Sequence, residues 1–115
     1  MKKLTIRETR EAMAYIQRAA DILQHPRVSE IHFALPSANL ARVLREIIGR
    51  LKQRNKSLTA DEIRGITHAL QTAADFIQAD QIATLGYKFP DGEDVARNLR
   101  GIVMRIKMLA NKSRS

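Results

Sequence analysis

The strongest constraint on the fold of this chain is an internal repeat. Nine of the 21 residues from Leu4 to Gln24 are identical to those from Leu58 to Gln78, including Leu-Thr-x-x-Glu-x-Arg and Gln-x-Ala-Ala-Asp-x-x-Gln. A second stretch repeats after a one-residue insertion in the second copy: seven of the 13 residues from Leu40 to Lys52 are identical to those from Val95 to Lys107. Self-similarity at this spacing indicates two copies of one supersecondary unit.

Each copy is predicted to contain two helices. Thr5 and Thr59 are each followed by a glutamate three residues later, which is the pattern of a capping box at a helix start. Apolar residues at spacings of three and four then predict helices over about 6–24 and 60–77. No proline directly follows the second of these, which leaves a continuation toward residue 85 open. The second helix of each copy has the clearer apolar stripe, over about 38–54 and again after Asp91.

A single helical hairpin has too little apolar surface to be stable alone, so the two copies should pack face to face. The predicted fold is therefore all-α, a tandem duplication of a helical hairpin packed as one four-helix domain with an internal pseudo-twofold. Residues 1–115 form that single domain, with repeat 1 at 3–56, repeat 2 at 57–112 and a frayed basic tail at 112–115. The repeated pairs Ala19-Ala20 and Ala73-Ala74 suit close approach of two helices at its centre.

Composition excludes several classes of protein. The 115 residues include no cysteine, which removes disulfides, thiolate metal sites and cysteine nucleophiles and fits a reducing compartment. No apolar run follows Lys2-Lys3, and none approaches the roughly 20 residues of a membrane span. We therefore expect a cytoplasmic protein without a membrane partner. The formal net charge of +8 favours an anionic binding partner.

The sequence offers little for catalysis. His25, His32 and His68 are isolated, and no spacing of histidines and carboxylates indicates a metal site or a cofactor motif. The repeated Asp21 and Asp75 could line a polar groove suited to acid–base chemistry or a cation. The alternative is that they bond neighbouring helix ends or arginines such as Arg10 and Arg64. We expect that the protein is not an enzyme and that it binds neither a metal nor a cofactor.

A repeated basic stripe is the main functional signal. On a 100° helical wheel it lies on the far side of each second helix from the apolar stripe. Arginine donates bidentate hydrogen bonds to phosphate, and displaced counterions supply affinity. The stripe therefore predicts a small accessory or regulatory protein that binds nucleic acid, and the alternative explanation is a solvated basic surface. The predicted contact residues are Arg42, Arg45, Lys52, Arg97, Arg100 and Lys107.

Two methionines distinguish the second copy from the first. Met104 and Met108 stand where the first copy has Gly49 and Gln53, on the helix face that is expected to be exposed to solvent. Exposed methionine beside arginine is typical of a protein-binding patch, so an acidic protein partner or a homodimer is the alternative function. A further contact with the core is the other explanation for these residues.

Overall fold

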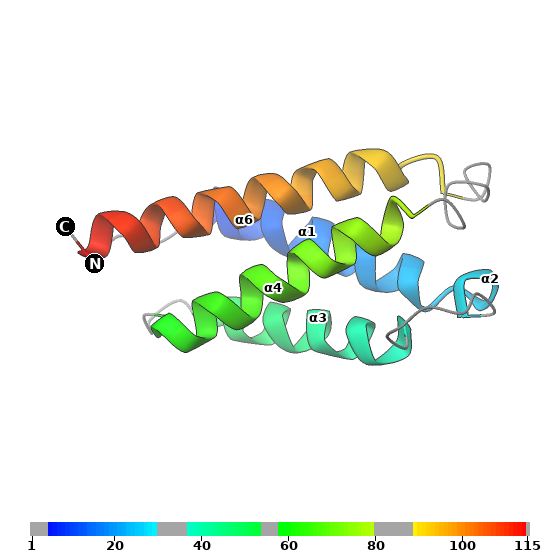
Figure 1. The fold of residues 1–115 in the computed structure, drawn as a ribbon, viewed down its shortest axis with the longest axis horizontal. Helices are drawn as coiled ribbons and strands as arrows, with labels where there is room; N and C mark the ends of the chain where they lie inside the picture. The colour runs from blue at the N-terminus through cyan, green and yellow to red at the C-terminus, as the bar shows by residue number, and fades with distance from the viewer. Residues whose placement is uncertain (1–4, 30–36, 54–57, 80–88, 115) are drawn as a thin grey trace.

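The computed structural model describes residues 5–29, 37–53, 58–79 and 89–114. Within them the chain forms four long helices, a short one and no strand, so the all-helical prediction is confirmed. The long helices run alternately up and down, so that α1 and α4 point one way and α3 and α6 the other (Figure 1). Their bounds are α1 Ile6–Leu23, α3 Ser37–Lys52, α4 Ala60–Ile77 and α6 Gly92–Arg114, with α2 at Pro26–Ser29.

Both capping boxes are present. The Glu8 backbone N–H donates to Thr5 Oγ1 at 3.0 Å, and the Thr5 backbone N–H donates to Glu8 Oε1 at 2.9 Å. Thr59 and Glu62 repeat the arrangement at 3.1 and 3.0 Å. Each box satisfies backbone groups that a helix start would otherwise leave without partners. The sequence pattern thus placed both helix starts correctly.

The helix ends lie close to the predictions, and the largest difference is at the C-terminal end of α6. Helix α4 ends at Ile77 with Gln78 as its C-cap, and residues 80–88, into which a continuation was considered, lie outside the described part. Helix α6 continues to Arg114 through most of the segment expected to be a frayed tail. No proline interrupts that stretch, and basic residues near a helix C-terminus are favoured by the helix dipole.

The helices pack as a square in which each hairpin occupies one side. Helix α1 packs chiefly on α3, and α4 packs chiefly on α6. The hairpins then meet along two seams, α1 against α6 and α3 against α4, and α1 also contacts α4 across the centre. Helices α3 and α6 consequently lie at opposite corners, along the lower and upper edges of Figure 1.

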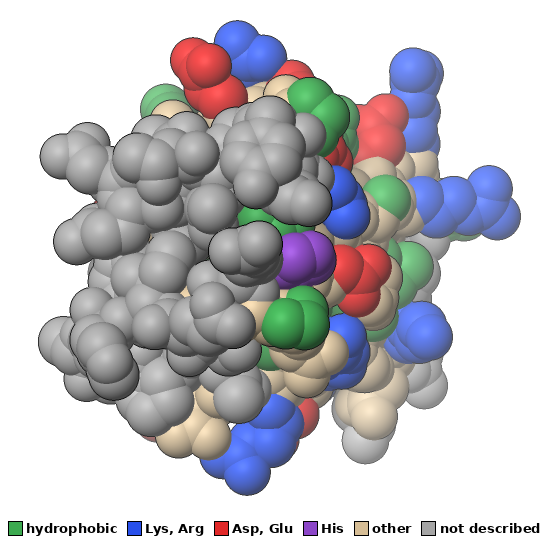
Figure 2. Space-filling view, turned by 90° about the vertical axis from the view of Figure 1, so that its right-hand side faces the viewer, with side chains coloured by type: hydrophobic (Ala, Val, Ile, Leu, Met, Phe, Trp, Pro, Cys, Tyr) green, Lys and Arg blue, Asp and Glu red, His purple; other side chains and the backbone are tan. Residues whose placement is uncertain are grey.

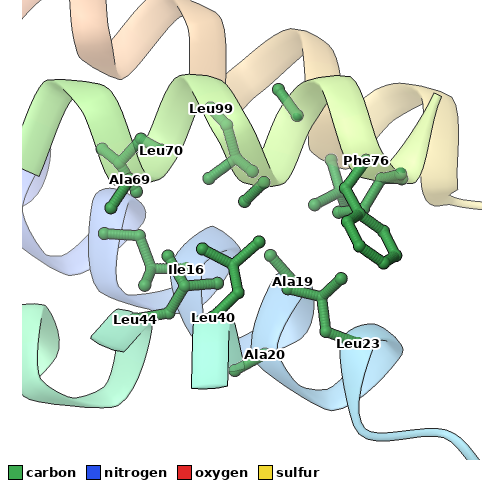
Figure 3. Close-up of a cluster of buried hydrophobic side chains, with 14 of the residues drawn as sticks. Ile16, Ala19, Ala20, Leu23, Leu40, Leu44, Ala69, Leu70, Phe76 and Leu99 are labelled. Atoms are coloured by element: carbon green, nitrogen blue, oxygen red, sulfur yellow. The ribbon is translucent and has the colours of Figure 1, made fainter. Parts of the chain in front are cut away.

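The core fills the space between the four helices. Leu44 of α3, Leu70 of α4 and Leu99 of α6 are fully buried, and Figure 3 shows them converging with Ile16 of α1. The alanine pairs of α1 and α4 are also fully buried. Their short side chains allow the contact between α1 and α4 across the centre of the square. The hydrophobic stripes read from the sequence are therefore the surfaces that pack.

Three exposed helical glycines, Gly49, Gly65 and Gly101, leave room for stabilisation, and the last two serve as the test. A Cβ built on Gly65 or Gly101 meets nothing within 4 Å, and both residues lie inside helices with negative φ. Alanine there reduces the entropy of the unfolded chain without strain, so each substitution should raise the free energy of unfolding by about 0.5–1 kcal/mol. Urea denaturation of Gly65→Ala and Gly101→Ala measures this. A loss of stability in either variant would contradict the open space around these two glycines.

Candidate nucleic-acid interface

The predicted phosphate-contacting residues lie on α3 and α6, in matching places. Arg42 and Lys52 of α3 are exposed, as are Arg97 and Lys107 of α6, while Arg45 and Arg100 are half-buried. Because α3 and α6 occupy opposite corners, the structure does not bring the two sets together.

Arg45 and Arg100 are each bonded to an aspartate of their own hairpin. Arg45 Nη2 lies 3.4 Å from Asp21 Oδ1, across the α1–α3 pair. Arg100 Nη2 lies 2.7 Å from Asp75 Oδ1 across α4–α6, and Arg100 also donates to the Gln78 side chain. The positive charge of both arginines is thus partly neutralised. The alternative reading of the sequence, that these aspartates bond arginines, therefore holds, but the arginines are Arg45 and Arg100 and not the examples Arg10 and Arg64.

The same contacts place Asp21 and Asp75 outside any shared groove. Gln17 donates to Asp21 at 2.9 Å and Gln71 donates to Asp75 at 3.0 Å, so each carboxylate has an amide and an arginine of its own hairpin. The two hairpins lie on opposite sides of the square. These aspartates therefore do not form the pair that acid–base chemistry would need.

Eight basic side chains lie on two opposite faces of the bundle, four on each face. We define the hairpin-1 flank as the outer surface of α1 and α3 with Arg10, Arg42, Arg45 and Lys52, and the hairpin-2 flank as that of α4 and α6 with Arg64, Arg97, Arg100 and Lys107. Arg10 belongs to its flank because it shares a helix face with Gln17 and Asp21, seven and eleven residues on. The four positions of one flank correspond to those of the other in the sequence repeat.

The flanks differ in how far acids neutralise them. On the hairpin-1 flank only Arg45 has an acidic partner, and Arg10, Arg42 and Lys52 bond no acid among the described residues. On the hairpin-2 flank Arg64 bonds Asp61, Arg97 bonds Asp94 at 2.8 Å and Arg100 bonds Asp75. Lys107 has no acidic partner within the described ranges. The first flank is therefore the more strongly positive of the two.

The other two faces are the seams, which ion pairs join across the hairpins. Arg105 Nε of α6 donates to Glu8 Oε2 of α1 at 2.6 Å, and Arg50 of α3 forms a two-pronged bond to Glu62 of α4, with Nη2 3.1 Å from Oε1. Each glutamate is also the capping-box residue of its helix. One carboxylate thus holds a helix start and a hairpin contact together, a double role that the capping pattern alone did not indicate.

These bonds keep the seam carboxylates ionised. The Arg50 guanidinium, with the Thr59 backbone N–H, lowers the pKa of Glu62 from 4.5 to about 2. Arg105 and the Thr5 N–H likewise lower the pKa of Glu8. A third carboxylate, Asp91, accepts from Arg18 Nε at 2.6 Å and Nη2 at 2.9 Å, and this bond lowers its pKa too.

Acid should therefore weaken the fold within a defined window. A carboxyl whose pKa is lower in the folded than in the unfolded state stabilises the fold above its unfolded value, and the contribution disappears as pH falls through the folded value. We expect the free energy of unfolding to be level above about pH 5 and to fall from there toward pH 2, the pKa of Glu62. Urea denaturation across this range measures the effect. Glu62→Gln should flatten the profile, whereas the same change at exposed Glu93 should leave it steep.

The histidines and methionines complete the described surface. The His25 ring meets Phe89 edge-on with centroids 4.9 Å apart, His68 is exposed and His32 lies outside the described residues. Met104 and Met108 are 65% and 48% exposed, so their side chains are not extra core contacts. Figure 2, which looks along the bundle from its α2 end, shows basic side chains projecting from the rim with acidic ones between them.

Within the described ranges, no cluster of three His, Asp or Glu side chains could hold a metal ion. None of the described helices is both long enough and apolar enough to span a membrane. Comparison of the chain with protein-family models, with curated proteins and with solved structures found no match in any of the three.

Proposed function

We propose that the domain arose by tandem duplication of one helical hairpin and retains a pseudo-twofold axis along the bundle. Two reciprocal sets of contacts support this. Arg105 bonds Glu8 while its counterpart Arg50 bonds Glu62, and the pairing of Arg45 with Asp21 matches that of Arg100 with Asp75. Reciprocity of this kind is the mark of a two-fold interface, in which each contact occurs twice.

We further propose that the protein is a non-enzymatic, cytoplasmic nucleic-acid-binding protein that contacts the phosphate backbone. The observation that supports it best is the hairpin-1 flank, where Arg10, Arg42 and Lys52 have no acidic partner among the described residues. Cations already bonded to carboxylates must exchange one anion for another, whereas unpaired cations gain a phosphate and release its counterions. These three residues therefore contribute most, and Arg45, Arg97, Arg100 and Lys107 contribute through the same chemistry.

The seam cations do not belong to this site. Arg50 and Arg105 bond the capping glutamates, and Arg18 bonds Asp91 through two nitrogens of its guanidinium group. Removing any of them would break a contact between the hairpins, so their effect is on stability.

The proposed binding is to backbone and not to base sequence. Single-strand binders stack bases on exposed aromatic rings, and in the described part of this chain Phe76 and Phe89 are buried and Tyr15 is half-buried against the core. Phosphate contacts position a protein on a duplex without reading its bases. A duplex, DNA or RNA, is accordingly the favoured ligand.

Fluorescence anisotropy with labelled duplex DNA, titrated across salt, tests this function. Four contacts from the hairpin-1 flank predict that log K falls against log salt with a slope of about −3.6, at about 0.9 per phosphate contact. A slope of about −5 would mean six contacts on one duplex, which is more than one flank supplies. Absence of binding near 50 mM salt, where backbone contacts are strong, would refute the proposal.

The exposure of Met104 and Met108 favours a second function, docking of an acidic protein on the outer face of α6. Apolar, adaptable side chains beside Lys107 suit such a surface. Met104→Asp should then abolish a stoichiometric complex recovered from nuclease-treated extract, because it places a charge in the contact. The matched control is Gly49→Asp, the equivalent position on α3, which should retain the complex. Loss in both variants, or in neither, would contradict this function.

A further inference from the structure

We propose that one copy of this protein binds two nucleic-acid duplexes at once, one on each flank, and so bridges them. The inference rests on the proposed function, and it concerns how many ligands the domain engages and where. It follows from the placement of the eight flank cations on two opposite faces of the bundle.

The first step is the direction in which each flank faces. Asp21 bonds Arg45 across the outer side of α1 and α3, and Asp75 bonds Arg100 across the outer side of α4 and α6. Lys52 and Lys107 share a helix face with these arginines, seven residues on in each case. Since α1–α3 and α4–α6 are opposite sides of the square, the two flanks face away from each other.

The second step is that one straight duplex cannot contact both flanks. The body between them measures 22 Å across and 43 Å along the bundle. The faces that would connect one flank to the other are the seams, where the arginines of the cross-hairpin contacts are bonded to glutamate or aspartate. A backbone leaving one flank thus meets no continuous path of unneutralised charge to the other.

The third step is that two bound duplexes would not repel each other strongly. The Debye length is about 8–10 Å at physiological salt, so charges held apart by a 22 Å body are screened by more than two such lengths. The length of 43 Å also corresponds to about 13 base pairs at 3.4 Å each, which is enough for each flank to hold a short duplex.

The two sites should differ in strength. Three arginines of the hairpin-2 flank already bond Asp61, Asp75 and Asp94, whereas one arginine of the hairpin-1 flank bonds an acid. A first duplex should therefore occupy the hairpin-1 flank, and bridging should follow when the hairpin-2 flank takes a second. Excess protein should suppress bridging, because each duplex then binds the hairpin-1 flank of a different protein molecule and the hairpin-2 flanks stay empty.

The test uses the full chain and a mixture of donor-labelled and acceptor-labelled DNA duplexes of slightly more than the 13 base pairs estimated above. Energy transfer between duplexes reports bridging, and anisotropy of one duplex reports binding. The hairpin-1 variant is Arg10→Gln with Arg42→Gln and Lys52→Gln, and the matched hairpin-2 variant is Arg64→Gln with Arg97→Gln and Lys107→Gln. Circular dichroism of both variants confirms that they remain helical.

Bridging predicts energy transfer with the native chain, its decline at excess protein, and its loss in both variants, while the hairpin-2 variant still binds a single duplex. Energy transfer that persists in the hairpin-2 variant would overturn the proposal, because a self-associated protein could bridge through two hairpin-1 flanks. Binding without energy transfer at any ratio would overturn it as well and leave the proposed function intact. No binding of a single duplex would refute both.

Discussion

Replacing Arg10, Arg42 and Lys52 together by glutamine should weaken duplex binding about 100-fold, at on the order of 1 kcal/mol for each lost contact. All three are exposed, and none bonds an acid among the described residues. The change removes charge without breaking an ion pair that supports the fold. The salt dependence of binding should also become shallower by about 2.7 in slope, since each phosphate contact accounts for about 0.9. Anisotropy titrations at several salt concentrations measure both quantities.

The hairpin-2 variant is the matched control for this experiment. Arg64, Arg97 and Lys107 occupy corresponding positions, but two of them bond Asp61 and Asp94, so these two must give up a carboxylate before they bond a phosphate and contribute less to binding. We expect a clearly smaller loss of affinity for a single duplex. Equal losses in the two variants would show that ion pairing does not govern the site, and no loss in either would place the binding surface elsewhere.

The second large effect concerns stability. Leu44→Ala and Leu99→Ala should each lower the free energy of unfolding by about 2–5 kcal/mol, because both side chains are fully buried between helices. The two positions correspond in the sequence repeat, and each lies on the inner face of the second helix of its hairpin. If the hairpins are equivalent, the two losses should agree within about 1 kcal/mol, as cavities of similar size cost similar amounts.

Urea denaturation monitored by circular dichroism measures these losses, with an unchanged m-value as evidence that the unfolding reaction is the same. Met104→Ala is the control, since its side chain is 65% exposed and its removal leaves no cavity. A large loss at one leucine and a negligible one at the other would contradict the equivalence of the two hairpins.

Much of this fold was predictable from local sequence. The capping boxes at Thr5 and Thr59 fixed two helix starts, because their chemistry depends on residues only three positions apart. The apolar stripes fixed which faces pack, since burial follows the helical period. The end of α6 was less well predicted, because helix ends depend on capping contacts that propensity does not encode.

The candidate site was predictable only in part. Helical geometry placed Arg42, Lys52 and Lys107 on exposed surface, as the structure has them. It could not identify the partners of Arg45 and Arg100, because these depend on how two helices are offset along each other. Arg50 and Arg105 lie on the same helices as the basic stripe, yet both bond glutamates of the opposite hairpin. Only the packing of the hairpins reveals those contacts.

The contact of Arg18 with Asp91 makes the two seams unequal. Among the described residues the α1–α6 seam has this pair as well as the Arg105–Glu8 pair, one toward each end, whereas the α3–α4 seam has the Arg50–Glu62 pair at one end. No counterpart of Arg18 is available in the second copy, where Thr72 stands in its place. Partial opening should therefore begin between α3 and α4, at the end near α2, while the α1–α6 seam stays closed. Amide hydrogens facing the α3–α4 seam would then exchange with solvent before those facing the α1–α6 seam.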